Sequence, residues 1–310
     1  MEKGNQSFVT EFILAGLSNN PTTEIILFVL FLVIYLCALT GNLLIVTVIQ
    51  VDSRLHTPMY FFLSNLSFVD ITYTSIIVPK MLELFLSPRK VISFVGCMTQ
   101  VYIYLFLGET ECLLLAAMAY DRYVAICNPL HYMIIMNKTA CLKLAGIAWM
   151  CGFVISLIDI YITVRLPFCG PNYIDHFFCE IPVVLKLACA DISLNEVIMV
   201  AGASLLLIVP LILVLISYFR IITAILKMHS VEGRRKTFST CASHLVVVTI
   251  FYGTAMVLYM KPRSEHTTSD KAVSVFYTII TPMLNPLIYS LRNKDVKQAI
   301  GKTLEIKTAL

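Results

Sequence analysis

The stretch from residue 25 to residue 50 reads IILFVLFLVIYLCALTGNLLIVTVIQ and contains no charged side chain. A helix needs about 20 mostly apolar residues to cross the hydrocarbon layer of a bilayer, so this stretch is long enough to span one. Six further stretches of similar character follow it. The expected spans cover about residues 25-50, 58-82, 95-127, 140-164, 197-227, 237-261 and 271-291. This pattern predicts an all-α membrane protein, a seven-transmembrane helix bundle that forms one domain over residues 1-310.

The composition of the whole chain supports a membrane protein. Apolar residues make up 58% of the 310 residues and charged residues only 14%, and the mean hydropathy is +0.84. Soluble domains carry about 25% charged residues, so this chain has too few charges to cover a water-facing surface. The same figures exclude a disordered, collagenous or coiled-coil protein. The net charge of +4 is small and scattered, and it does not indicate a nucleic-acid partner.

The basic residues orient the bundle. If the N-terminus is extracellular, 14 of the 23 lysines and arginines fall on the cytoplasmic side, which is the side where they gather in membrane proteins. We therefore expect a multi-pass plasma-membrane protein with an extracellular tail at 1-24 and a cytoplasmic tail at 292-310. The first span would act as an uncleaved signal-anchor, because no cleavable signal peptide is recognisable. Asn5 begins a glycosylation sequon on the outer tail.

After the last span, Val296, Ala299 and Ile300 recur at helical spacing. This spacing predicts a short amphipathic C-terminal helix that lies on the inner leaflet of the membrane lipid.

Four of the ten cysteines fall on the predicted outer side, where disulfides form. They are Cys97, Cys169, Cys179 and Cys189. Four cysteines permit three pairings, and the residues alone do not choose among them. A zinc site is the alternative, but the even spacing of ten residues between the last three is unlike that of metal ligands. Three of the four lie in the long loop from Val164 to Glu196, which we expect to cover the outer end of the bundle.

Several ordered motifs carry a family resemblance over nearly the whole chain. They are Gly41-Asn42, Leu55-His56-Thr57-Pro58-Met59-Tyr60, Met118-Ala119-Tyr120-Asp121-Arg122-Tyr123-Val124-Ala125-Ile126-Cys127, Ser217-Tyr218, Lys236-Thr237-Phe238-Ser239-Thr240-Cys241-Ala242-Ser243-His244, Phe251-Tyr252-Gly253 and Pro282-Met283-Leu284-Asn285-Pro286-Leu287-Ile288-Tyr289-Ser290-Leu291-Arg292-Asn293. The sequence resembles the rhodopsin-like G-protein-coupled receptors and, within them, the tetrapod-type (class II) odorant receptors. The resemblance implies the disulfide pairs Cys97–Cys179 and Cys169–Cys189.

The resemblance also implies a ligand site in the outer half of the bundle. The residues that match the family's pocket positions are Tyr104, Leu105, Gly108, Ile181, Gly202, Ala203, Leu206, Tyr252, Ala255, Met256, Tyr259, Val275 and Thr278. Such a lining is apolar with a few hydroxyls, which suits small volatile molecules. The implied partner inside the cell is a Gs-type olfactory G protein that raises cyclic AMP. A non-olfactory receptor of the same class for a small lipophilic ligand is the alternative.

The inner ends of the spans hold the residues that the resemblance assigns to switching and coupling. They are Asp121, Arg122, Tyr123, Tyr218, Lys236, His244, Asn285, Pro286 and Tyr289. Arg122 would be released when the helices part, whereas the plain alternative is an interfacial anchor. The foot of span six reads Arg234-Arg235-Lys236, so no acidic latch for Arg122 is present there. His244 is expected to be either a proton sensor or, more simply, a hydrogen-bonded structural residue.

Two acids inside spans, Asp70 and Glu111, are costly to bury and so indicate function. Two carboxylates in one cavity repel each other, and a sodium ion or a proton would relieve them. Asn42 and Asn285 add further oxygens, so we expect a Na⁺ or proton site that stabilises the resting bundle; a protonated structural pair is the alternative. Glu109 and Asp159 either pair across spans three and four or line the pocket floor.

Two other classes of membrane protein fit the sequence less well. An integral-membrane enzyme would show a catalytic motif, and the chain has neither HExxH nor GxSxG. A channel or transporter would line a through path with charge, but the acids within the spans are few and one-sided.

Overall fold

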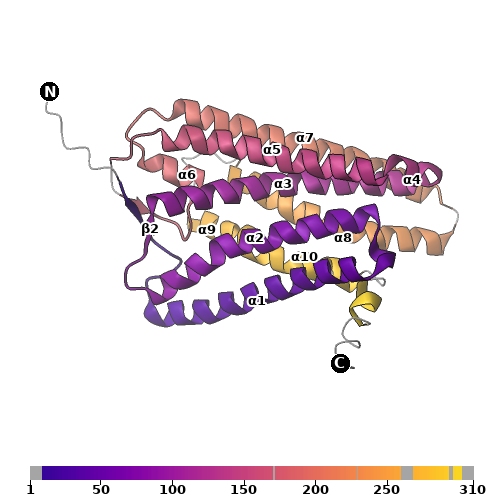
Figure 1. Ribbon diagram of the computed structural model, residues 1–310, viewed down its shortest axis with the longest axis horizontal. Coiled ribbons are helices and arrows are strands. Elements are labelled where there is room, and N and C mark those ends of the chain that lie inside the picture. Colours follow the sequence, from indigo (N-terminus) through magenta and orange to yellow (C-terminus); the bar gives the residue numbers. More distant parts are fainter. Residues whose placement is uncertain (1–8, 170–171, 229, 260–267, 293–295, 302–310) are drawn as a thin grey trace.

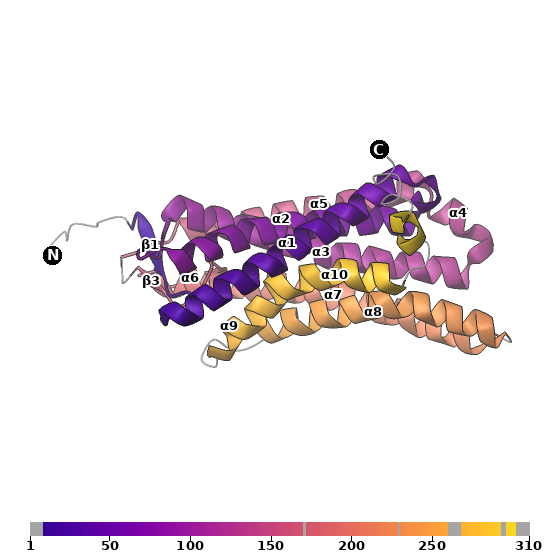
Figure 2. The ribbon, with the colours of Figure 1, turned by 90° about the horizontal axis from the view of Figure 1, so that it is seen from below.

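The computed structural model describes residues 9–169, 172–228, 230–259, 268–292 and 296–301. Within these residues seven helical segments are long and apolar enough to cross a membrane. The first six are α1 (Pro21–Val51), α2 (Pro58–Leu86), α3 (Phe94–Cys127), α5 (Lys138–Val164), α7 (Ser193–Leu226) and α8 (Val231–Tyr259). The seventh joins α9 (Thr268–Val275), a π-helical turn at Phe276–Ile280 and α10 (Thr281–Arg292). The predicted seven-helix bundle is confirmed (Figures 1 and 2).

The helices run beyond several of the expected spans. α2 continues to Leu86 and α7 begins at Ser193. α8 begins at Val231, ahead of the span expected from residue 237, so the basic run that follows is helical as well. A span is bounded by the reach of the apolar run, whereas a helix continues until its backbone hydrogen bonds end. Short elements connect the long helices. They are the 3₁₀ turns Ser53–Leu55, Pro129–His131 and Leu185–Leu187, and the helices α4 (Tyr132–Ile135) and α6 (Ile181–Val184).

A small sheet lies at one end of the bundle (Figure 1). β1 (Glu11–Leu14) lies between β2 (Val91–Ser93), which is antiparallel to it, and β3 (Tyr173–Ile174), which is parallel to it. Residues 11–14 fall within the tail expected to be extracellular, and they form the central strand of this sheet. Phe12 and Leu14 are buried in a second apolar core with Cys97 and Ile174. We call this the outer end and the opposite end the inner end, after the expected topology.

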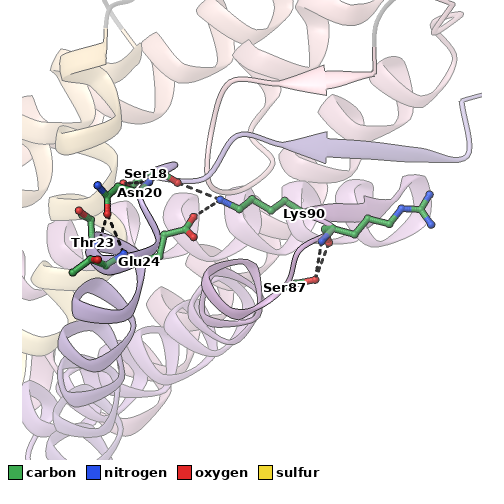
Figure 3. A network of polar contacts seen from close by, with 8 residues as sticks. Ser18, Asn20, Thr23, Glu24, Ser87 and Lys90 are labelled. Atoms are coloured by element: carbon green, nitrogen blue, oxygen red, sulfur yellow. Dashed lines mark hydrogen bonds and ion pairs between the residues drawn. The ribbon is translucent and has the colours of Figure 1, made fainter.

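Polar contacts fix the start of α1 at the outer end (Figure 3). The Asn20 side-chain oxygen accepts hydrogen bonds from the backbone N–H groups of Thr22 (3.0 Å) and Thr23 (3.3 Å), as expected for an N-cap residue. Lys90, from the segment between α2 and α3, pairs with Glu24 in the first turn of α1 and donates to the carbonyl oxygen of Ser18 (3.2 Å). The bonds of Lys90 thus join two segments that are distant in the sequence.

At the inner end, residues 296–301 are helical, as predicted. Val296 and Ala299 are buried in the main core of the bundle, and Ile300 packs against that core. The other face of this helix makes a polar contact, in which Nη1 of Arg54 donates to the Gln298 side-chain oxygen (3.2 Å). The apolar side of this helix therefore rests on the bundle itself.

Gly152 sets the close approach of α5 to α3. A Cβ at this position would lie 2.5 Å from the Thr110 hydroxyl and 2.8 Å from the carbonyl oxygen of Phe106. Ser156, Asp159 and Thr163 continue the same buried stripe along α5. The absent side chain thus brings these polar residues close to α3.

We expect Gly152→Ala to destabilise the bundle by about 1–3 kcal/mol, because the added methyl group must push two packed helices apart. The measurement is thermal unfolding of the purified protein in detergent. Gly146→Ala on the same helix is the control, since its Cβ would meet nothing within 4 Å. Equal losses of stability in the two variants would contradict the argument.

Candidate functional site

A cavity of about 60 Å³ lies in the outer half of the bundle, among α3, α5, α7, α8 and the π-helical turn. Its lining residues are Tyr104, Leu105, Gly108, Glu109, Cys112, Asp159, Met199, Ala203, Leu206, Leu207, Phe251, Ala255, Tyr259 and Tyr277. Most of the lining is apolar, and the polar groups are two carboxyls, a thiol and tyrosine hydroxyls. A concave apolar site with a few polar groups is the usual form of a small-molecule pocket.

The cavity matches the expected pocket in part. Seven of the expected residues line it: Tyr104, Leu105, Gly108, Ala203, Leu206, Ala255 and Tyr259. Six do not: Ile181, Gly202, Tyr252, Met256, Val275 and Thr278.

Some of those six have other roles. Ile181 is buried in the second core at the outer end. The Tyr252 hydroxyl donates to the carbonyl oxygen of Cys112 (2.9 Å). The Thr278 hydroxyl donates to the carbonyl oxygen of Ser274 (2.7 Å) within its own helix.

Seven other residues line the cavity: Glu109, Cys112, Asp159, Met199, Leu207, Phe251 and Tyr277. Glu109 and Asp159 were expected there as one of two alternatives, and the other five were not assigned to the pocket from the sequence. The helical spacing of Leu105, Glu109 and Cys112 puts these three residues on one helix face. This spacing is a signal by which Glu109 and Cys112 could have been assigned to the pocket. Tyr277 lies in the π-helical turn. Such a turn changes which side of the helix its residues face, and the sequence pattern did not reveal it.

Aromatic side chains close the outer side of the cavity. The hydroxyl groups of Tyr104 and Tyr259 are hydrogen-bonded at 2.6 Å, joining α3 to α8. The ring of Phe178, from the long loop, packs on Tyr104 with ring centroids 5.2 Å apart. Tyr73 and Tyr277 add further ring contacts at 5.3 and 6.4 Å from Tyr104. Phe178 therefore places the long loop directly against the cavity wall.

Two disulfides hold this loop. Cys97 at the start of α3 is joined to Cys179, with Cα atoms 5.5 Å apart, and Cys169 is joined to Cys189, with Cα atoms 5.8 Å apart. These are the pairs that the family resemblance implies, so none of the four is left as a zinc ligand. Within the described residues no cluster of three or more histidines, cysteines or acids could hold a metal ion. Asn5, the expected glycosylation site, lies outside the described residues.

Glu109 and Asp159 both line the cavity, which answers the question that the sequence left open. Their charges are close enough to interact. Oε2 of Glu109 is buried and has no hydrogen-bond partner among the described residues. The two carboxyls therefore form part of the pocket wall.

A second polar cluster lies deeper in the bundle. The Asn285 amide donates to both carboxylate oxygens of Asp70 (3.2 and 3.1 Å), and Asp70 is within electrostatic reach of Glu111. The Asn42 amide donates to the carbonyl oxygens of Ala38 and Pro282 (3.0 Å each). Three buried oxygens then have no donor among the described residues: Asn42 Oδ1, Asn285 Oδ1 and Glu111 Oε1. Such unpaired acceptors are chemically suited to a hard cation or a proton.

His244 ties three helices together near the inner end. Its Nε2 lies 3.1 Å from the carbonyl oxygen of Leu115 on α3, which can only accept, so Nε2 carries the proton. In the neutral ring Nδ1 then accepts from the Tyr218 hydroxyl of α7, 2.7 Å away. Both ring nitrogens are thus used, as expected for a structural histidine. Tyr218 is bonded to His244 in this structure.

Arg122 lies at the inner end of α3, where its charge interacts with that of the neighbouring Asp121. The Asp121 carboxylate also accepts a hydrogen bond from the Tyr132 hydroxyl of α4 (2.8 Å). Burial and the neighbouring Asp121 raise the pKa of Tyr132 well above its usual range, so the phenol keeps its proton and remains a donor. Nε of Arg122 is buried without a hydrogen-bond partner among the described residues.

The remaining coupling residues surround this region. Tyr123 packs on Tyr120 with ring centroids 6.2 Å apart, and Pro286 lies inside α10, against Gly41 of α1. The Tyr289 hydroxyl is buried with no partner among the described residues. The side chain of Lys236 lies outside the described part of the chain.

An inner cleft of about 390 Å³ opens between α7 and α8. Its lining residues are Ile222, Ile225, Leu226, Val231, Arg234, Arg235 and Phe238. An apolar floor with arginines beside it suits an amphipathic helix that carries acidic residues.

Comparisons with known proteins agree on one family. The family model described as "Olfactory receptor" matches residues 31–307. Olfactory receptor 10A7 of Homo sapiens is 54% identical over 304 residues, which cover 98% of this chain and 96% of that protein. Olfactory receptor 2C1 of Mus musculus is 50% identical over 305 residues, 98% of each chain. The crystal structure of squid rhodopsin superposes with a TM-score of 0.71 at 17% identity, covering 92% of this chain and 86% of that one, and it shows a shared fold.

Proposed function

The chain belongs to the olfactory receptor family, and on that premise we propose that it is an odorant receptor of the plasma membrane in which the outer cavity binds the odorant and the inner cleft binds a Gs-type G protein. The observation that carries the proposal is the arrangement of the two sites along the same helices. α7 and α8 line both the cavity and the cleft, and the His244 bonds join these helices to α3 between the two sites.

The two sites are coupled only if the odorant distinguishes two arrangements of the helices. An odorant that binds the active arrangement more tightly shifts the population by that difference in affinity. In our proposal the Tyr104–Tyr259 contact rearranges, the His244 bonds break, and the inner ends of α7 and α8 part. Arg122 then becomes accessible to the G protein. By linkage, a bound G protein raises the affinity for the odorant by the same factor.

We also propose the topology in which the N-terminus is extracellular and the inner end faces the cytoplasm. The basic residues near the inner ends of the helices support it, because such residues gather on the cytoplasmic side and attract anionic lipid.

A panel of odorants with a cyclic AMP readout tests the receptor proposal, and Ala255→Phe tests the position of the pocket. Ala255 lines the cavity and is buried, so a phenyl group there fills the space and should raise the half-maximal concentration of an active odorant at least about tenfold. Val257→Phe, two residues along the same helix at a half-exposed position, is the matched control and should respond normally. Equal responses of the two variants would place the odorant elsewhere.

We further propose that Asp70, Glu111, Asn42 and Asn285 hold a sodium ion or a proton in the resting bundle. The three donor-less oxygens of this cluster support the idea. Replacing sodium by a large organic cation should lower the half-maximal odorant concentration about fivefold in the wild-type receptor. Glu111→Gln should remove this dependence, and Asp191→Asn, on the outer surface, should keep it. A sodium effect of the same size in both variants would exclude the sodium site.

A further inference from the structure

The cavity wall contains two carboxyls that nothing in the described structure neutralises. Glu109 comes from α3 and Asp159 from α5, and both line the cavity. Asp159 is only 7% exposed. Oε2 of Glu109 is buried and has no hydrogen-bond partner among the described residues. Both acids are therefore held at the cavity, and Glu109 Oε2 is an unused acceptor there.

Among the described residues, no basic side chain shares this space. The fourteen residues that line the cavity include no lysine, arginine or histidine. The ion pairs between lysine or arginine and an acid within the described residues lie at the ends of the bundle, for example Lys80–Glu83 and Arg54–Asp52. A proton or a bound ligand can therefore supply the compensating charge for Glu109 and Asp159.

The packing of α3 against α5 keeps the two acids together. Gly152 allows the close approach of these helices, and Asp159 follows it by seven residues on the same buried stripe. Thr110, which Gly152 contacts, is the residue next to Glu109. Two carboxylates held in a site of low dielectric repel each other strongly and attract a cation strongly.

The chemical class of ligand follows from these groups. A neutral alcohol can donate one hydrogen bond but leaves the negative charge uncompensated. A carboxylic acid, once ionised, adds further negative charge. A protonated amine supplies a positive charge and up to three donors, which two carboxylates can accept. Alkylamines, like the lysine side chain, are protonated at neutral pH.

The volume limits the size of the ligand. A water-sized group needs about 10–15 Å³ of such space, so a cavity of about 60 Å³ holds roughly four to six heavy atoms. Leu206, Ala203 and Phe251 offer an apolar surface for a short hydrocarbon body.

We propose that this receptor prefers small aliphatic amines, with the ammonium group bound between Glu109 and Asp159 and the hydrocarbon body against α7 and α8. The inference rests on the proposed function, since it names the class of odorant for the same cavity. Glu109 and Asp159 then determine specificity.

The test compares isobutylamine with 2-methylpropan-1-ol, which has the same carbon skeleton and no charge. Both are applied to cells that carry the wild-type receptor, Glu109→Gln, Asp159→Asn and the double variant, with cyclic AMP and surface expression measured together. We expect isobutylamine to be at least about tenfold more potent than the alcohol on the wild type. Each single variant should raise the half-maximal amine concentration about 10- to 100-fold, which is the usual effect of losing a charge-assisted hydrogen bond.

Two controls separate this inference from the receptor proposal. Asp191→Asn removes a charge from an exposed outer position and should leave the amine response unchanged. The half-maximal concentration of the alcohol should change less than about threefold in the Gln and Asn variants, because the alcohol is uncharged and forms no ion pair with either carboxylate.

The outcomes are distinct. Equal potency of amine and alcohol on the wild type, unchanged amine potency in the variants, or silence toward every amine would overturn the amine inference. Activation by a neutral odorant that Arg122→Ala abolishes would still support the receptor proposal. Absence of any G-protein response across a broad odorant panel would overturn both.

Discussion

Replacing Arg122 by alanine is expected to reduce odorant-stimulated cyclic AMP to less than about a tenth of the wild-type signal per receptor at the surface. Arg122 lies at the inner end of α3, and its Nε has no partner among the described residues. Its guanidinium group is therefore ready to bind a new partner when the inner end opens. Each charge-assisted hydrogen bond is worth about 1.5–3 kcal/mol, and about 1.4 kcal/mol is a tenfold change in an equilibrium constant.

The readout must count receptors at the surface, because an anchoring role for Arg122 predicts a different result. An anchor would lower surface expression and leave the signal of each remaining receptor intact. Lys143→Ala is the matched control, since Lys143 is an exposed basic residue near the inner end of α5. A full signal per surface receptor in Arg122→Ala would remove this residue from the coupling mechanism.

Removing the Cys97–Cys179 disulfide is expected to abolish the odorant response and most of the surface expression. Both cysteines are fully buried, and the bond joins positions 82 residues apart. Loss of a native disulfide costs about 2–5 kcal/mol, more for a longer closed loop. Phe178, beside Cys179, would lose its fixed position on Tyr104, so the cavity wall would be disordered as well. The double variant Cys97→Ser/Cys179→Ser avoids a lone reactive thiol.

The second disulfide provides the comparison. Cys169 and Cys189 are only 20 residues apart, so their loss should cost roughly 1 kcal/mol less in the chain-entropy account. We expect Cys169→Ser/Cys189→Ser to retain part of both surface expression and response, measured by surface labelling and cyclic AMP. A receptor without Cys97 and Cys179 that responds as well as this one would contradict the argument.

The sequence predicted some of the residues that line the cavity and missed others. Tyr104 and Gly108 were assigned to the pocket from the family resemblance, and both line the cavity. Tyr277 was missed because the π-helical turn alters the helix face that residues after Val275 present. Asp159 was left undecided because its partner depends on how α5 crosses α3.

The sheet at the outer end could not be predicted from the sequence either. β1, β2 and β3 have four, three and two residues, so none is long enough to show an alternating pattern. Their pairing depends on which loops meet at the outer end. At the inner end, the hydrogen bond that Tyr132 of α4 donates to Asp121 was likewise not predicted from the sequence.

The number of membrane crossings was determined by the sequence alone. Each crossing is a local property: a run of about 20 apolar residues is stable in lipid only as a helix that satisfies its own backbone hydrogen bonds. Only the tertiary structure decided which side chains meet within the bundle. Whether Glu109 and Asp159 share a cavity, or His244 joins α3 to α7, depends on the rotation and crossing of whole helices. Those are set by packing between residues far apart in the chain, such as Gly152 against Thr110.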